Sequence, residues 1–218
     1  MTDKKTPLKI PGTFGSIYAG FWSRLGAALL DTLILLPYSA LVVYINSLSI
    51  YGHYFTFVPG IIVHVWFNIY LVKKYGGTPG KLLLGIKIIK LDGNDVTWRE
   101  AFLRQVVTLA MSVFGSLITL YGLSLADPEY YDSLGWLYKQ QYIMGLIPVL
   151  STIFVWTNNI WVYSELFVLL FNKRKRAIHD FMANTVIVKT RYLKKIREVM
   201  NAEPTPSTEN TNEQDVRE

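Results

Sequence analysis

Four long apolar runs constrain this chain more than any other feature of its sequence. They cover Leu25–Ile45, Phe57–Val72, Ala101–Leu123 and, inside a longer apolar stretch, Ser151–Phe171. A helix of about 20 apolar residues is long enough to cross the hydrocarbon core of a bilayer. Only 17% of the 218 residues are charged, whereas soluble domains contain roughly 25%. We therefore expect an all-α membrane protein, a four-transmembrane-helix bundle, and not a soluble enzyme.

The fourth span can begin in two ways. The whole stretch Tyr142–Phe171 would be about 45 Å long as one helix, which exceeds a hydrocarbon core of about 30 Å. Either the helix begins outside the membrane near Pro148, or it breaks around Asn158–Asn159. We prefer a span over Ser151–Phe171, preceded by an interfacial segment.

Lysine and arginine residues predict the orientation of the spans. Of the 22 cations, all except Lys139 lie before span one, between spans two and three, or after span four, counting those at the span ends. Such loops stay in the cytoplasm under the positive-inside rule. We therefore expect both termini to be cytoplasmic, in a bacterial inner (plasma) membrane. No apolar stretch precedes Phe21, so span one is expected to act as its own uncleaved insertion signal.

Several classes of function are disfavoured by residues that are absent or wrongly spaced. The chain has no cysteine, which excludes thiolate nucleophiles and cysteine zinc sites. The Gly80-Lys81 pair lacks the other residues of a phosphate-binding loop, because position 75 is Tyr and position 82 is Leu. The cations flank apolar spans and form no continuous face, so no nucleic acid partner is expected. We predict no enzymatic activity and no cofactor.

A small β element is expected on the cytoplasmic side. The β-branched segment Ile86–Leu91 ends at the strong turn signal Asp92-Gly93. We predict that it pairs with Thr185–Val188, although half of a hairpin with Val96–Trp98 is an alternative. The sequence Thr97-Trp98-Arg99-Glu100 fits a helix capping box immediately before the third span.

The composition divides the chain into three parts. Residues 1–16 are expected to form a cytoplasmic segment, 17–190 the membrane domain, and 191–218 a basic and then acidic disordered tail. The last sixteen residues hold five acids, one arginine and two prolines, which is a composition typical of disorder. Ten cations follow span four, beginning with Lys173, Arg174, Lys175 and Arg176. We expect these four to face anionic lipid headgroups.

Polar side chains inside the spans are the candidate functional residues. A charge at the centre of a membrane helix costs roughly 2.5–3.5 kcal/mol on insertion scales. Carboxylate and amide oxygens suit a hard monovalent cation, and a buried acid with a raised pKa is the usual proton carrier. The predicted depths overlap, so one polar cavity on three helices is expected to hold the candidate ion or proton path: Asp31, His64, Asn68, Asn158 and Glu165.

Each candidate also has a structural interpretation. Asp31 could pair with a cation to fix helix packing, and Glu165 could reach the Lys173–Arg176 segment. Helical side chains lean toward the N-terminus, so Arg24 points away from Asp31 and is free to face lipid phosphate or Asp180. Arg104 is expected to snorkel to the interface.

The positions of one arginine and two aspartates resemble the RDD family of membrane proteins. Arg24 lies at the start of span one, Asp31 lies inside it, and Asp180 follows span four. The turn Gly77–Lys81 and the segment Arg99–Arg104 also resemble the family, and the likeness runs from about residue 17 to 189. It implies a multi-pass membrane domain. Ligand transport is suggested for the family, monovalent cation/proton antiport is attributed to some members, and others are accessory domains of membrane assemblies.

Two functional hypotheses follow from the residues and the resemblance. In the first, the chain is a small-ligand or monovalent cation/proton transporter that uses Asp31, and a homodimer forms the full pathway because four spans are few for alternating access. In the second, it is a membrane scaffold or assembly protein with a basic, lipid-binding cytoplasmic face. An intramembrane enzyme is the weakest alternative, since no paired-aspartate or serine–histidine pattern is present.

Overall fold

The computed structural model describes residues 6–13 and 15–202. Within them, four helices are long and apolar enough to cross a membrane, as predicted. The first is α1 (Phe21–Leu48), the third α5 (Trp98–Ser124) and the fourth α8 (Pro148–Phe171). The second is a continuous rod made of α2 (Gly52–Val65), a π-helical turn η1 (Trp66–Tyr70) and α3 (Leu71–Tyr75). This rod has 24 residues, so the second span is longer than the sequence indicated.

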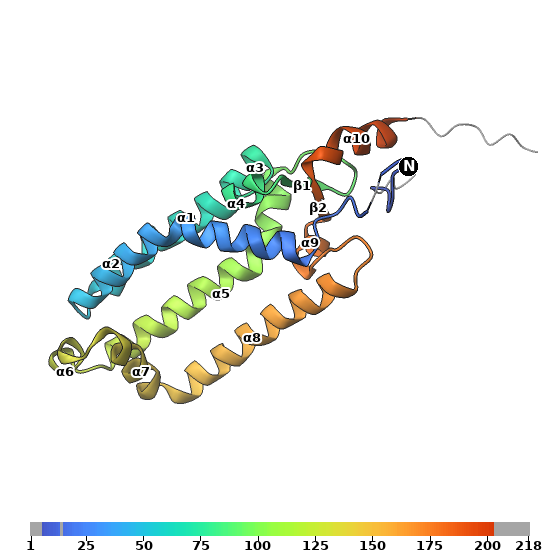
Figure 1. The fold of residues 1–218 in the computed structure, drawn as a ribbon. Coiled ribbons are helices and arrows are strands. Elements are labelled where there is room, and N and C mark those ends of the chain that lie inside the picture. The colour runs from blue at the N-terminus through green and yellow to red at the C-terminus, as the bar shows by residue number, and fades with distance from the viewer. Residues whose placement is uncertain (1–5, 14, 203–218) are drawn as a thin grey trace, which may run out of the picture.

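Two short helices lie at one end of the bundle, between the third and fourth spans (Figure 1). They are α6 (Pro128–Ser133) and α7 (Trp136–Leu146). The helix α8 starts at Pro148. Proline has no backbone N–H, but the first N–H of a helix has no partner within that helix, so a proline at this position loses no hydrogen bond. It runs unbroken through Asn158. The fourth span therefore begins near Pro148, and the alternative break around Asn158–Asn159 is wrong.

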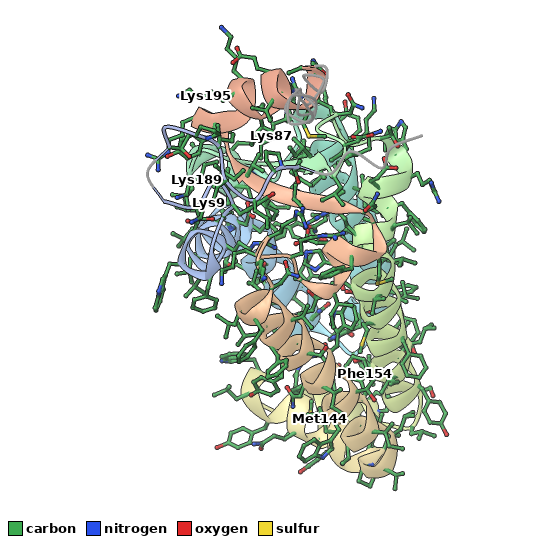
Figure 2. All side chains as sticks on the ribbon, turned by 90° about the vertical axis from the view of Figure 1, so that its right-hand side faces the viewer. Lys9, Lys87, Met144, Phe154, Lys189 and Lys195 are labelled. Carbon is green, nitrogen blue, oxygen red and sulfur yellow. The ribbon has the colours of Figure 1, made fainter. Side chains whose placement is uncertain are left out.

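The opposite end of the bundle carries most of the charge, and we call it the charged end. It holds α4 (Pro79–Leu83), β1 (Ile86–Lys90), α9 (Ile178–Met182), β2 (Thr185–Lys189), a 3₁₀ turn η2 (Thr190–Tyr192) and α10 (Leu193–Asn201). Lys9, Lys87, Lys189 and Lys195 gather there in Figure 2, whereas Met144 and Phe154 lie toward the other end.

The predicted strand pairing is confirmed. Strands β1 and β2 run antiparallel, with Ile88 opposite Ile187. The alternative hairpin with Val96–Trp98 is wrong, because the returning chain makes one isolated bridge, between Ile89 and Asp95, and then enters α5. The capping box of α5 is present, and the Thr97 N–H donates to Glu100 Oε2 at 2.9 Å.

Two flanking segments support this small sheet, which would otherwise be marginal. The chain around Tyr18 lies beside β2, where the Ala19 N–H donates to the Ile187 carbonyl at 2.9 Å. On the same core, α10 buries Ile196 completely. Disorder was expected from residue 191 onward, and it is wrong for Leu193–Asn201, whose apolar side covers the sheet. Residues 203–218 lie outside the described residues.

A second apolar cluster joins the sheet to the spans. It brings together buried residues of the first three spans, of both strands and of the chain just before the first and third spans: Ala19, Ala27, Ile69, Val72, Ile86, Ile88, Val96, Ala101 and Ile187. The apolar mid-span window of α1, by contrast, contains no fully buried residue. Two apolar clusters thus lie at the charged end, next to the polar residues discussed below, and a third, around Ile50, Leu123, Tyr131 and Ile143, lies at the opposite end.

Candidate functional site

Asp180 is the centre of a buried ion cluster that ties three elements together. Its side chain is 0% exposed. Arg24 of α1 donates from Nη1 to Oδ2 at 2.7 Å, and Arg104 of α5 donates to Oδ1. The Ala177 N–H, at the start of α9, also donates to Oδ2, at 3.0 Å. The first span, the third span and the segment after the fourth are thus held at one carboxylate.

The arginines around Asp180 have further partners in the β element. Arg104 Nη1 donates to Thr185 Oγ1 at 2.6 Å, and Arg176 Nε donates to the Thr185 carbonyl at 3.0 Å. Burial alone would raise the pKa of Asp180, but the adjacent Arg104 and Arg24 outweigh it and lower that pKa well below its usual range. Asp180 is therefore a fixed negative charge at any physiological pH.

Two expectations about basic residues are corrected by this cluster. Arg104 does not snorkel to the interface, because it is only 4% exposed and pairs with Asp180 instead. Of the four cations expected to face lipid, only Lys173 is exposed, and Arg176 is buried among protein carbonyls. For Arg24, the alternative that the structure contains is the pairing with Asp180.

Asp31 forms a second centre, where α1 meets the turn before α4. It lies ten residues into α1, or about 15 Å along the axis. Thr78 Oγ1 donates to Oδ2 at 2.5 Å and the Gly80 N–H donates to Oδ1 at 2.7 Å. Because Gly80 is the second residue of α4, Asp31 satisfies a backbone donor that a helix leaves unpaired at its N-terminus. The intramembrane acid thus caps a different helix.

Gly80 is required for this close approach. A Cβ at this position would lie 2.3 Å from the Ala27 carbonyl oxygen and 2.8 Å from Asp31 Oδ1. Glycine lets the backbone of α4 approach α1 so closely that the carboxylate reaches it directly.

Lys81 completes the second centre. Its Nζ lies 3.9 Å from Asp31 Oδ2 and donates to Thr78 Oγ1 at 3.1 Å. Burial lowers the pKa of Lys81 to about 8; Asp31 raises it, and the nearby Arg104 and Arg24 lower it. The two carboxylates Asp31 and Asp180 therefore share one electrostatic neighbourhood with these cations, and Lys81 is the member that can lose its proton near neutral pH.

Glu165 of α8 caps a short helix, as Asp31 of α1 does. It accepts the His179 N–H at 3.0 Å, and His179 is the second residue of α9. Its other oxygen lies 2.7 Å from His179 Nδ1. Glu165 does reach the segment after span four, but it meets His179 there and not the cations Lys173–Arg176.

The structure distributes the five candidate path residues over four places. Asp31 lies with Thr78 and Lys81, and Glu165 lies with His179. His64 lines a cavity between α1, α2 and α5, and the Asn68 side chain donates to its backbone carbonyl at 3.3 Å from within the π-helical turn. Asn158 is exposed on the outer surface of α8. The prediction that all five residues line one polar cavity is therefore wrong.

Sequence reasoning missed several residues that make up these centres. Thr78 and Lys81 were given no role beyond the turn Gly77–Lys81, Arg176 was expected only to face lipid, and His179 was given no role. Thr78 is 1% exposed although it is polar and lies in a loop. A polar residue directly before Pro79 is a helix-start signal, but nothing local in the sequence indicates that the capping acid comes from α1.

Comparison with known proteins agrees with this architecture. The model of the RDD family matches residues 18–184, a range that contains Arg24, Asp31, Arg104 and Asp180. An uncharacterized protein of Bacillus subtilis (strain 168), YckC, is 32% identical over 114 residues, which is 47% of this chain and 71% of that protein. No solved structure matches the chain. The matched range includes both charged centres and all four spans, and the chain therefore belongs to the RDD family of multi-pass membrane proteins.

Proposed function

We propose that this protein exchanges a monovalent cation for a proton, with Asp31 and Lys81 as the exchanging pair. In this proposal the charged end faces the cytoplasm of a bacterial plasma membrane, as the distribution of lysine and arginine predicts. The supporting observation is the contact between Asp31 and Lys81. Their charged atoms are 3.9 Å apart, so this ion pair is looser than the direct 2.7 Å contact between Arg24 and Asp180.

The surroundings of Asp31 offer oxygen ligands to a hard cation. Asp31 Oδ2 and Thr78 Oγ1 are adjacent, and Lys81 Nζ contacts Thr78 Oγ1. When Lys81 Nζ releases its proton, the local positive charge falls by one. A monovalent cation beside Asp31 and Thr78 then restores that charge, which gives an exchange of one proton for one cation. Hard cations prefer such carboxylate and hydroxyl oxygens to nitrogen ligands.

The pH dependence follows from the pKa of Lys81. Below about pH 8 the amine is protonated and competes with a cation for Asp31, and above it the amine is neutral. Cation loading is therefore expected to increase as the cytoplasmic pH rises through 8. Asp180 takes no part in the exchange, because its two arginines keep it charged at every pH in this range.

The test is sodium- or potassium-dependent proton flux in vesicles that contain the purified protein. Asp31→Asn keeps an oxygen that can accept the Gly80 N–H but loses the charge, so flux should fall to the background of empty vesicles. Glu165→Gln is the matched control, because Glu165 also caps a short helix yet has no lysine or arginine in ionic contact among the described residues. This control should retain flux.

The outcomes separate the alternatives. Full flux in Asp31→Asn would eliminate Asp31 as the carrier. Lys81→Gln should remove the rise in flux around pH 8, and a rise that survives would exclude Lys81 as the proton donor. If the native protein gives no cation-dependent flux, the exchange proposal is wrong as a whole.

A scaffold function is the second candidate, and the folded charged end favours it. The β element, the segment around Tyr18 and α10 form one packed unit beside the spans. The charged end carries the exposed lysines Lys173, Lys194 and Lys195, which suit anionic lipid headgroups. Cross-linking in native membranes from cysteines introduced at these three positions should then recover a specific partner protein. Recovery of no specific partner protein would oppose this function.

A further inference from the structure

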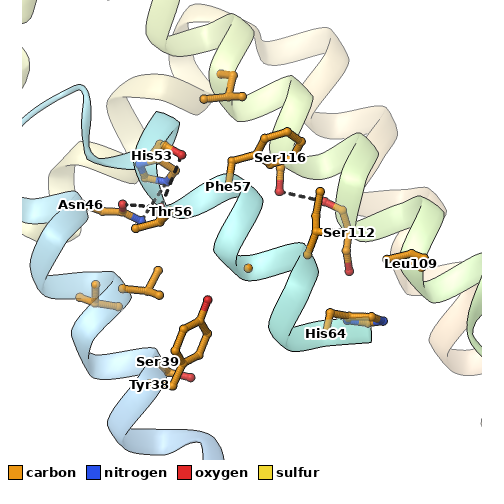
Figure 3. A pocket seen from close by; sticks show the side chains of 15 residues that line it. Tyr38, Ser39, Asn46, His53, Thr56, Phe57, His64, Leu109, Ser112 and Ser116 are labelled. Carbon is orange, nitrogen blue, oxygen red and sulfur yellow. Dashed lines mark hydrogen bonds between the residues drawn. The ribbon is translucent and has the colours of Figure 1, made fainter. Parts of the chain in front are cut away.

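A cavity of about 430 Å³ lies between α1, α2 and α5, away from the two charged centres (Figure 3). Three polar atoms that border it are buried and have no hydrogen-bond partner among the described residues. They are the Tyr38 hydroxyl, His53 Nδ1 and His64 Nε2. An unpaired polar atom in a membrane helix is costly. Three of them on one cavity indicate that its normal contents supply the missing partners.

The neighbours of His53 favour one tautomer of its ring. Thr56 Oγ1 donates to Asn46 Oδ1 at 2.9 Å. The other end of the Asn46 amide, the NH2 nitrogen Nδ2, faces His53 Nε2 at 3.5 Å. His53 Nε2 is then an acceptor, and in the neutral ring Nδ1 carries the proton. Figure 3 shows this group at one end of the cavity. Both His53 Nδ1 and the Tyr38 hydroxyl can therefore donate to an acceptor oxygen.

The walls of the cavity define the rest of the ligand. Among the described residues that line it, none is acidic and none is lysine or arginine, so neither an anion nor a cation would find a countercharge. Apolar side chains and hydroxyl groups make up the remaining surface, including Val42, Phe57, Leu109 and Ser112. Such walls suit a neutral, largely apolar molecule with a few polar oxygens.

The spacing of the three unpaired atoms indicates an elongated ligand. His53 and His64 are eleven residues apart on α2, or about 16 Å along the axis. Tyr38 reaches the level between them, because a Cβ on Gly60 would lie 3.8 Å from its hydroxyl. A neighbouring cavity shares Val43, Asn46 and His53 with this one and continues to Trp136, Lys139 and Gln140 of α7. The Lys139 amine already donates to the Ser47 carbonyl at 2.9 Å. The cavity thus extends from the end of the bundle near α7 to the middle of the spans.

We infer that this cavity binds a neutral, elongated, membrane-soluble molecule whose carbonyl oxygens accept hydrogen bonds from Tyr38 and His53, with the chemistry of a lipid-soluble quinone. The site is separate from Asp31, and the inference does not depend on cation exchange.

Binding to the full chain in lipid nanodiscs tests it, with empty nanodiscs as the background. The probes are a decyl-substituted benzoquinone and decylbenzene, which has the same tail without carbonyl oxygens. The native protein should retain the quinone and should bind it at least fivefold more tightly than decylbenzene, since a hydrogen bond contributes about 1 kcal/mol. Equal retention of both probes would overturn the inference, because it would indicate an apolar crevice without oxygen recognition.

Variants locate the site. Tyr38→Phe removes only a hydroxyl and should weaken quinone binding about fivefold, whereas Tyr44→Phe, at an exposed position of the same helix, should leave it unchanged. Gly60→Val introduces a side chain under Tyr38 and should reduce binding without affecting the charged centres. Unchanged binding in both Tyr38→Phe and Gly60→Val would place the quinone elsewhere and refute the assignment.

Discussion

Two aspartates define the protein at the scale of single residues, and their partners give them different properties. Asp180 contacts two guanidinium groups directly and has no exposed surface. Asp31 accepts two hydrogen bonds from neutral donors, and its cation is an amine at 3.9 Å. Arginine does not lose its proton in proteins, whereas a buried lysine does so readily. The first pair is therefore permanent, and the second responds to pH.

Arg104→Ala tests the permanence of the Asp180 cluster. The change leaves a fully buried carboxylate with one guanidinium instead of two, and removing one partner of a buried ion pair costs about 3 kcal/mol. The thermal unfolding temperature of the purified protein should fall accordingly. Arg99→Ala removes an exposed arginine at the start of the same helix and should change stability by less than about 1 kcal/mol. Equal effects of the two substitutions would contradict the central role of Arg104.

These residue partners were only partly predictable. The positions of Asp31, Arg24 and Asp180 were identified from the sequence, and Asp180 was one of two alternatives for Arg24. The pairing of Arg104 with Asp180 was not foreseen. Those two residues are 76 positions apart. An arginine near the end of a span is normally expected to extend its charge to the membrane interface, and only the fold shows that an acid lies beside this one.

Short helices at the charged end are the characteristic elements of this structure. Both α4 and α9 have five residues, and such helices are too short to be stable alone. Each has a backbone N–H bound by an acid that belongs to a membrane span, Asp31 for α4 and Glu165 for α9. The long helix α5, by contrast, is capped by its own residues. The cap of α5 could therefore be predicted from the sequence, whereas the caps that distant spans supply to α4 and α9 could not.

Gly80→Ala tests the contact between α4 and α1. Alanine favours an isolated helix over glycine by about 1 kcal/mol, but here the added Cβ would meet the Ala27 carbonyl at 2.3 Å. The substitution should therefore lower the unfolding temperature. Gly145→Ala, in α7 with nothing within 4 Å of the new Cβ, should leave it unchanged or raise it. If Gly80→Ala stabilises the protein as Gly145→Ala does, α4 does not pack against α1 in this way.

For the whole molecule, the position of α8 raises the question of how the protein assembles. This helix lies at the edge of the bundle in Figure 1, and only 6% of its apolar window is buried. Asn158, near its middle, is exposed, and its side chain makes no hydrogen bond to any of the described residues. An asparagine at this depth in a membrane is normally bonded to another helix. We therefore expect α8 to pack against a second copy of the chain.

Asn158→Leu should shift the purified protein from dimer to monomer in mild detergent, as measured by light scattering or by cross-linking in vesicles. Thr157→Val is the control, because the Thr157 hydroxyl already donates to the Ile153 carbonyl of its own helix at 2.8 Å. The same oligomeric state in all three proteins would show that α8 is not the dimer contact.

The sequence by itself determined the number of spans and the family, and it favoured the pairing of β1 with β2 over a hairpin with Val96–Trp98. These follow from local patterns: the length of apolar runs, β-branched segments between turn signals, and the spacing of a few polar residues. The tertiary structure alone decided that Arg104 is buried, that Asp31 and Glu165 cap short helices, and that Tyr38, His53 and His64 border one cavity. The physical reason is that burial and charge pairing depend on which surfaces meet, and partners such as Arg24 and Asp180 are 156 positions apart in the chain.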